Sequence, residues 1–302
     1  MITLKSLLHQ GTMILKEAGI EEASQDAWLL LEYTANISRA WYFAHGEEIV
    51  PAETEAQFLD LCRKRSSHIP LQHLTHRAWF MEYEFYVDEH VLIPRQDTET
   101  LVELARHHLK GRKDPRILDM CTGSGCILIS LLACRKDGQG TGADLSPEAL
   151  KVAKKNASAL GVEHRIQFLE SDLFSHKFFS GKDGNTPPVY DMLVSNPPYI
   201  ATDEIESLME EVRFHDPRMA LDGHGDGLYF YREITGQAKK YLKPGGWLLY
   251  EVGCTQGRAV ADMLKAAGFV SVEIKKDMAG LDRVVLGQLP EKDFAHQEEA
   301  HV

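Results

Sequence analysis

The sequence lacks several features that would each point to a particular class of protein. No apolar run approaches the ~18 residues that a membrane-spanning helix needs, and the first residues form neither an apolar signal core nor an Arg- and Ser-rich transit peptide. The five cysteines are odd in number and include no C-x-x-C pair, which argues against a disulfide framework. We therefore expect a cytoplasmic protein with reduced, mostly buried thiols and no membrane contact.

Positive charge is also scarce. The chain has 33 basic and 45 acidic residues and a net charge of −12, which argues against binding nucleic acid through non-specific phosphate contacts. The 14 histidines are mostly scattered. The close pairs, His73 with His76 and His107 with His108, have no cysteine partners and no metal-ligand spacing. The sequence thus predicts no metal site and no direct nucleic-acid partner.

The first part of the chain, residues 1–76, has apolar residues at steps of three and four, which predicts a small helical bundle. Pro51 is a favoured residue at a helix start. The basic run from Arg63 to Arg65 stands at an expected helix end, so we expect it on a solvated face. The apolar stripes are formed by Leu4, Leu7, Leu8 and Leu15, by Trp28 and Leu31, and by Phe58, Leu59 and Cys62.

The pattern then changes twice. Residues 77–96 have a period of two, which predicts a hairpin linker. From residue 97 to 290 short apolar runs alternate with helical patterns, which is typical of a parallel α/β sheet. The polar, acidic tail 291–302 is expected to be disordered. The residues of the linker expected to share one face are Trp79, Met81, Tyr83, Phe85 and Val87.

Seven strands are predicted in the α/β part. The last two are joined by a short loop, so we expect them to pair antiparallel at one edge of the sheet. The predicted fold class is α/β: a Rossmann-like seven-stranded domain preceded by a small helical bundle. The strands are expected at residues 117–120, 140–144, 166–170, 192–195, 247–252, 272–275 and 284–288.

A glycine turn follows the first of these strands. Glycines let the backbone pass close to a ligand, and the helix after the turn offers free N–H groups at its start. A dinucleotide fingerprint would need a small residue where Leu128 stands, and no Gly-Lys-Ser/Thr follows, so NAD, FAD and P-loop sites are excluded. The turn consists of Cys121, Thr122, Gly123, Ser124 and Gly125.

Carboxylates end the next two strands. Asp144 stands where a carboxylate can accept two hydrogen bonds from a ribose diol; its alternative role as a helix cap is already filled by Ser146 and Pro147. Asp172 stands where it could accept a bond from an adenine amine, with Leu173 packing on the ring. The alternatives are a loop aspartate and a core leucine. A nucleoside-bearing ligand is predicted beyond the carboxyl ends of these strands.

The fourth strand ends in Asn196, Pro197, Pro198 and Tyr199. Two prolines fix φ and remove two N–H donors, so the carbonyls of Asn196 and Pro197 are left available to a ligand. If the Asn196 side-chain oxygen and the Pro197 carbonyl each accept one hydrogen of a substrate NH₂ group, a planar amide or amine nitrogen is held in place. Tyr199 would supply a flat wall. The alternative is a proline-rich exit loop.

Here the sequence resembles a known family. Asn-Pro-Pro-Tyr after a fourth strand, with a glycine turn after a first, is the pattern of amino-methyltransferases that use S-adenosylmethionine. The chain is similar in particular to the HemK/PrmC-type glutamine methyltransferases that modify peptide chain release factors. The resemblance runs over nearly the whole chain and includes Pro70 to Leu74, Val91 to Arg95 with Glu99, Asp216 to Arg218, Ala220 to Gly223, Asp226 to Leu228, Glu251 to Gly253 with Gln256, Lys276 and Asp277 with Gly280, and Arg283 to Val285.

The resemblance implies transfer of a methyl group from S-adenosylmethionine to the amide nitrogen of the glutamine in the Gly-Gly-Gln (GGQ) motif of class I release factors, with the helical domain helping to grip the factor. By position, it places Thr122 to Gly125 around the methionine moiety, Asp144 on the ribose, and Asp172 and Leu173 near the adenine. Asn196 to Tyr199 would hold the target glutamine. The predicted site thus combines cofactor and substrate residues.

Three positions depart from the family pattern. Cys121 stands where the family commonly has glycine, Leu173 where a tryptophan can stand, and Gln96 where proline is frequent. A side chain at Cys121 would narrow the approach to the methionine end, and Leu173 would stack less area on adenine.

Other interpretations stay open at this point. Adenine amino-methyltransferases of nucleic acids share Asn-Pro-Pro-Tyr, and a non-catalytic scaffold that binds S-adenosylmethionine is a third class. The pair His215 and Asp216 and the stretch from Asp222 to Gly227 could form an acid-base or metal loop, but a glycine-rich surface turn is the favoured interpretation.

Overall fold

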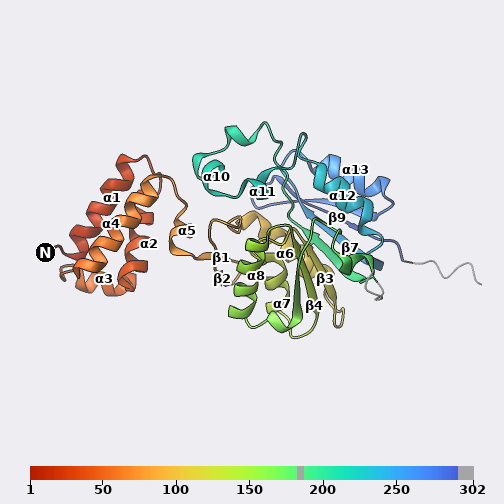
Figure 1. Ribbon diagram of the computed structural model, residues 1–302, viewed down its shortest axis with the longest axis horizontal. Helices are drawn as coiled ribbons and strands as arrows, with labels where there is room; N and C mark the ends of the chain where they lie inside the picture. Colours follow the sequence, from red (N-terminus) through yellow and green to blue (C-terminus); the bar gives the residue numbers. More distant parts are fainter. Residues whose placement is uncertain (182–186, 292–302) are drawn as a thin grey trace, which may run out of the picture. The chain divides into compact units, whose positions relative to one another are not determined.

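The structure is a computed structural model that describes residues 1–181 and 187–291 (Figure 1). The tail expected to be disordered lies outside the described residues, apart from Glu291. None of the described helices combines the length and the apolar character needed to cross a bilayer. All five cysteines are free: Cys62 and Cys126 are buried, Cys121 is half-buried, and Cys134 and Cys254 are exposed, so the expectation of mostly buried thiols is wrong.

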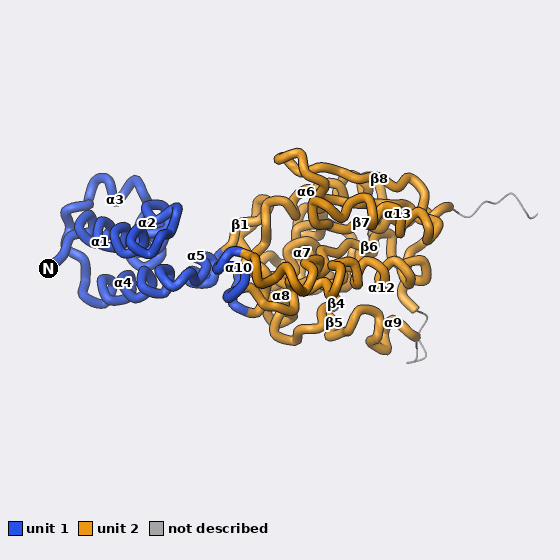
Figure 2. Tube along the Cα trace, turned by 90° about the horizontal axis from the view of Figure 1, so that it is seen from above, with its two compact units in different colours: residues 1–77, 87–89, 209–215 blue, residues 78–86, 90–208, 216–302 orange. Residues whose placement is uncertain are grey.

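The chain divides into two compact units (Figure 2). Unit 1 contains residues 1–77 together with two short segments from later in the sequence, residues 87–89 and 209–215. Unit 2 contains the rest of the described chain. Unit 1 is therefore assembled from three separate stretches of sequence.

Unit 1 is helical. Its core is formed by α1, α2 and α4, which pack on one another and bury Leu7, Leu15, Leu31 and Phe58 completely. The expected stripes are therefore present, and α4 begins directly after Pro51. The helices are α1 (Leu4–Glu17), α2 (Ala23–Ala35), α3 (Arg39–His45), α4 (Ala52–Ser66), α5 (Leu71–Thr75) and α10 (Glu210–His215).

Arg65 contradicts the expectation that the basic run at the end of α4 is solvated. Its side chain is buried, its Nε donates to Asp26 Oδ2 at 2.7 Å, and its Nη2 donates to Glu211 Oε1 at 2.5 Å. Burying a charge is costly unless it is paired and hydrogen-bonded. Arg65 meets this requirement by joining α2 and α10, whereas Arg63 and Lys64 are exposed.

Unit 2 begins with the predicted hairpin, formed by β1 (Ala78–Phe80) and β2 (Tyr83–Phe85). The expected shared face is wrong for Trp79, which is 69% exposed, whereas Phe80 is buried. The chain reverses at Met81, whose φ is +52°, so the alternation does not continue through the turn.

The rest of unit 2 is built on a seven-stranded sheet with the order β5-β4-β3-β6-β7-β9-β8. The first five strands in that order are parallel, and β9 runs antiparallel to both β7 and β8. The α/β fold and the antiparallel edge are thus confirmed. The strands are β3 (Arg116–Met120), β4 (Gln139–Asp144), β5 (Ile166–Glu170), β6 (Tyr190–Ser195), β7 (Leu242–Glu251), β8 (Val270–Lys276) and β9 (Asp282–Gln288).

Helices cover both faces of this sheet (Figure 1). Alternate residues of β3 enter separate cores: Ile117 packs with α6 and α7, while Leu118 and Met120 belong to the core that contains α12 and α13. The helices are α6 (Gln96–His108), α7 (Cys126–Ala133), α8 (Pro147–Ala159), α9 (Lys177–Ser180), α11 (Arg218–Leu221), α12 (Tyr229–Ala238) and α13 (Gly257–Ala266), with short 3₁₀ helices at Glu163–Arg165 and Ile205–Ser207.

The strand order reverses between β3 and β6. From β3 the chain proceeds outward through β4 and β5, and it then returns to pair β6 with the other side of β3. In open α/β sheets, ligands bind at such a switch point, beyond the carboxyl ends of the strands. The glycine turn follows β3, and Asn196 follows β6, so the fold brings both predicted motifs to this position.

Candidate functional site

The glycine turn is tied to the end of β4. The Thr122 N–H donates to the Ala143 carbonyl at 3.0 Å, and the Gly123 N–H donates to Asp144 Oδ2 at 2.8 Å. The other carboxylate oxygen of Asp144 accepts the Ser146 N–H at 2.9 Å. Asp144 is therefore fixed in place at the switch point, and Ser146 caps α8 as expected.

A second set of hydrogen bonds, which the sequence does not predict, also holds the glycine turn in place. Ser124 is buried, Gly125 is the N-cap of α7, and the Ser124 carbonyl accepts a hydrogen bond from Asn156 Nδ2 at 2.9 Å. The Asn156 amide also exchanges two hydrogen bonds with the backbone of Tyr86. The sequence contains no local signal for this role, because the partners of Asn156 lie 32 and 70 residues away.

Cys121 begins the turn with a φ of +61°. This left-handed conformation strains any residue with a Cβ and favours glycine, the residue that the resemblance leads us to expect at this position. Burial raises the pKa of the Cys121 thiol well above its usual range, and the carboxylates of Asp144, Asp119 and Asp172 raise it further. The negative charges of these three carboxylates therefore all act on the glycine turn at Cys121.

Asp119 is a site residue that the sequence did not single out. Its carboxyl group is fully buried in β3, and Thr122 Oγ1 donates to its Oδ2 at 2.6 Å. Burial raises the pKa of Asp119 to about 7, while the hydrogen bond from Thr122 lowers it. Within residues 1–181 and 187–291, nothing donates to Asp119 Oδ1. A buried carboxylate oxygen that accepts no hydrogen bond from the protein can accept one from a bound group.

The two residues expected near an adenine differ in exposure. Asp172 is exposed just after β5. Leu173 is only 8% exposed and belongs to the hydrophobic core, with a φ of +47° and a carbonyl that accepts the Ser171 hydroxyl at 2.6 Å. Leu173 therefore lies in the core, and its contact with an adenine stays a prediction.

The predicted reactive motif lies at the end of β6. Pro197 and Pro198 are buried, while Asn196 and Tyr199 are half-buried. Asn196 Nδ2 donates to Thr98 Oγ1 at 3.4 Å. Within the described part of the chain, no hydrogen bond reaches the Asn196 side-chain oxygen or the Pro197 carbonyl. Both acceptors that the sequence predicted for a substrate NH₂ group are therefore available.

The backbone of the Asn-Pro-Pro-Tyr motif packs against the stretch from Asp222 to Gly227, for which the sequence predicts a surface turn. Gly223 and Gly227 are buried, and a methyl group added at Gly227 would lie 2.4 Å from the Tyr199 carbonyl oxygen. The same carbonyl accepts a hydrogen bond from Gln256 Nε2 at 2.8 Å. Only residues 224–226 are exposed, so the expectation holds for the tip of the turn and is wrong for its two ends.

Glu251, the last residue of β7, is a further buried acid that the sequence did not assign to the site. The Tyr199 hydroxyl lies 3.5 Å from its Oε1. Burial raises the pKa of Glu251 to about 7, whereas hydrogen bonding to Thr98 and the charge of Arg283 lower it. The strand-end rule that identified Asp144 applies equally to Glu251 and could have found it.

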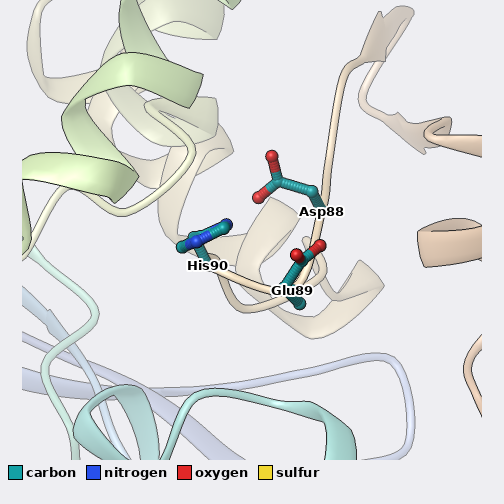
Figure 3. A group of neighbouring side chains, drawn as sticks. All are labelled: Asp88, Glu89 and His90. Atoms are coloured by element: carbon teal, nitrogen blue, oxygen red, sulfur yellow. The ribbon is translucent and has the colours of Figure 1, made fainter.

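The remaining polar candidates do not form a second site. Asp216 accepts a hydrogen bond from Arg95 at 2.8 Å, whereas His215 contacts the Ser67 carbonyl, so they do not act as a pair. Among the described residues, one group offers three possible metal ligands within 4.8 Å of one another: Asp88, Glu89 and His90 (Figure 3). They are consecutive in sequence, and such exposed acidic groups commonly occur without an ion.

Gly123 provides a test of where a cofactor would lie. Its φ is +53°, and an added methyl group would meet no protein atom within 4 Å. We expect Gly123→Ala to cost about 1 kcal/mol of stability through its backbone alone and to weaken binding of S-adenosylmethionine at least about tenfold. Calorimetric titration and thermal unfolding measure the two effects.

Gly161, just after α8, is the matched control. It has a φ of +68° and equally open surroundings, so Gly161→Ala is expected to cost the same stability without changing the affinity. Equal affinities for the two variants would show that the space beside Gly123 is not used by the cofactor.

Comparisons with known proteins cover both units. A family model described as the PrmC N-terminal domain matches residues 6–75, and one described as the methyltransferase small domain matches residues 96–228. The chain is 38% identical over 283 residues to the release factor glutamine methyltransferase of Clostridium acetobutylicum, with 94% of this chain and 97% of the relative covered. It is 40% identical over 276 residues to the protein of the same name from Cereibacter sphaeroides, with 91% and 95% covered.

Among solved structures, the catalytic domain of hMettl16 in complex with the MAT2A 3′UTR hairpin 6 is similar with a TM-score of 0.54. It is 15% identical, and the match covers 69% of this chain and 76% of that chain. At this level of identity the similarity shows the fold alone.

Proposed function

Because this chain belongs to the release factor glutamine methyltransferase family, we propose that it transfers a methyl group from S-adenosylmethionine to the side-chain amide nitrogen of the glutamine in the Gly-Gly-Gln motif of class I release factors. The observation that carries the proposal is the position of Asn196. It follows β6 beside the glycine turn, and its side-chain oxygen accepts no hydrogen bond from the described chain.

Asn196 and Pro197 perform the positioning that this reaction needs. An amide nitrogen is a poor nucleophile because its lone pair is delocalised. The Asn196 side-chain oxygen and the Pro197 carbonyl can each accept one of its hydrogens, which holds the nitrogen in a single orientation. Tyr199 borders the planar group. The nitrogen that gains a methyl group loses its proton readily to water or a carbonyl, so no general base is required.

The residues at the switch point fit the cofactor. S-adenosylmethionine supplies a methyl group activated by a positively charged sulfur. The space beside Gly123, where an added methyl group would meet no protein atom within 4 Å, is proposed to take its methionine end. Each Asp144 oxygen accepts one backbone N–H and keeps a second lone pair for a ribose hydroxyl. Asp172 and Leu173 are proposed to border the adenine.

Unit 1 is proposed to help hold the release factor. The support is the match of residues 6–75 to the PrmC N-terminal domain, together with the alignments to the two relatives, which cover 94% and 91% of this chain. Residues 1–76 would act as the substrate-recognition domain and residues 97–290 as the methyltransferase domain.

The test is methyl transfer from labelled S-adenosylmethionine to a purified release factor. A matched factor with the glutamine of its Gly-Gly-Gln motif replaced, DNA and RNA are assayed in parallel. Label on the intact factor alone is the expected result. Label on the altered factor would show that the enzyme methylates another residue of the factor. Label on nucleic acid in place of the factor would overturn the proposed function.

A further inference from the structure

We propose that Thr98 and Glu251 are positioning residues that hold the Asn196 side-chain amide with its oxygen toward the substrate. The assignment rests on the proposed function, because it concerns the acceptor that would hold the target nitrogen. It adds two buried side chains, from α6 and β7, to a motif that otherwise lies after β6.

Three side chains from separate elements meet at this point. Thr98 is 2% exposed in the first turn of α6, and Asn196 Nδ2 donates to its hydroxyl oxygen at 3.4 Å. The same hydroxyl interacts with the carboxyl group of Glu251 and lowers its pKa, and Glu251 is also 2% exposed. The first contact is long, but catalytic hydrogen bonds often tighten when the substrate is bound.

An asparagine amide needs such partners, because its oxygen and NH₂ ends have nearly the same shape. The shape of the surroundings alone cannot distinguish the two orientations. A hydroxyl cannot either, since it donates and accepts equally well. If the Asn196 amide were reversed, its NH₂ group would face the NH₂ group of the substrate, and neither could accept.

Glu251 removes the ambiguity. An ionised carboxylate only accepts hydrogen bonds, so it takes the Thr98 hydroxyl hydrogen. The hydroxyl oxygen is then left to accept from Asn196 Nδ2, and the amide oxygen turns away from Thr98. Glu251 also faces the Tyr199 hydroxyl at 3.5 Å, so one carboxylate acts on Tyr199 directly and on Asn196 through Thr98.

The experiment compares Thr98→Val, which removes the hydroxyl at nearly constant shape, with Thr98→Ser, which keeps it. Thr98→Val is expected to lower kcat for the release factor about tenfold, the effect of one lost hydrogen bond, with an unchanged KM for S-adenosylmethionine. Thr98→Ser is expected to restore most of that rate. In the Asn196→Ala background, Thr98→Val should cause no further loss, because the two residues act through one contact.

Thr141→Val is the control for general damage. Thr141 is also buried and bonds a single side-chain hydroxyl, that of Tyr190 at 3.0 Å. Its substitution should lower the melting temperature without lowering kcat. A Thr98→Val enzyme with the wild-type kcat, or one that loses the same factor again in the Asn196→Ala background, would overturn the assignment. Wild-type transfer, assayed alongside, tests the proposed function separately.

A pH profile provides an independent readout. Burial raises the pKa of Glu251 to about 7, the Thr98 hydrogen bond and Arg283 lower it, and Asp97 raises it. These groups face Glu251 from α6 and β9, and Tyr199 faces it after β6. Below this pKa the neutral carboxyl can donate to Thr98 and the orientation of the amide is no longer specified. We expect kcat to rise with pH through about 7.

Glu251→Gln should remove this inflection. Saturating S-adenosylmethionine is used, because Asp119 at the cofactor turn also has a pKa raised to about 7. Stability changes in the opposite direction: the folded pKa of Glu251 lies above its ordinary value of 4.5, so its contribution is complete below 4.5 and is lost as pH rises through about 7. An inflection of kcat that persists unchanged in Glu251→Gln would contradict the role of Glu251.

Discussion

Replacing Asn196 by alanine is expected to lower kcat for methyl transfer by a factor of about 100 or more, because misplacing a reacting group by about 1 Å has an effect of this size. The variant loses the side-chain oxygen that accepts from the target nitrogen, and it also frees the Thr98 hydroxyl from its contact at 3.4 Å. Because Asn196 is only half-buried, its replacement by alanine leaves a small cavity, and the variant should still fold.

Two measurements separate this effect from lost cofactor binding. Single-turnover transfer to the release factor measures the chemical step, and calorimetry measures the affinity for S-adenosylmethionine. We expect the first to fall and the second to change little. An Asn196→Ala enzyme that retains more than half of the wild-type rate would show that the substrate amide is held elsewhere.

Gly227→Ala is expected to be nearly as damaging, although the residue carries no chemistry. A methyl group there would lie 2.4 Å from the Tyr199 carbonyl oxygen and 2.6 Å from Gln256 Nε2, and the φ of +69° is unfavourable for alanine. The backbone of the reactive motif must shift to relieve these contacts. A loss of roughly 1–3 kcal/mol in stability and of about 100-fold in kcat is expected.

The same turn contains its own control. Gly225 is exposed, and a methyl group added to it would meet no atom within 4 Å. Gly225→Ala should therefore change stability by less than about 0.5 kcal/mol and leave kcat unchanged. Thermal unfolding and the methyl transfer assay are run on both variants. Equal behaviour of the two would mean that contact with the Tyr199 backbone does not matter.

The features that the sequence predicted well share one property: their signal is local. Apolar runs followed by a polar residue identified strand ends at Asp144 and Asn196, and the topology of a parallel sheet then brings such ends to one edge. The helix cap at Ser146 depends only on the residues next to it. Local patterns of this kind survive folding because neighbouring elements do not alter them.

The features that were missed depend on partners far away in the sequence. Thr98 lies in the first turn of a helix, a position that by itself indicates no role. Its role follows from its contact with Asn196, which lies 98 residues later in the sequence. A glycine is needed at position 227 because its backbone lies against that of Tyr199. Arg65 looks like a typical helix-end cation, and its burial follows from Glu211, 146 residues away. No periodicity encodes these distances.

The contact between Arg65 and Glu211 also decides how the protein can be divided. The family models favour a cut after residue 77, because one ends at residue 75 and the next begins at residue 96. Such a cut would leave α10 in the catalytic fragment without the bundle that it packs on, and Arg65 in the helical fragment without one of its two carboxylates. Two fragments produced together, with the freedom to reassociate, should be more soluble than either one alone.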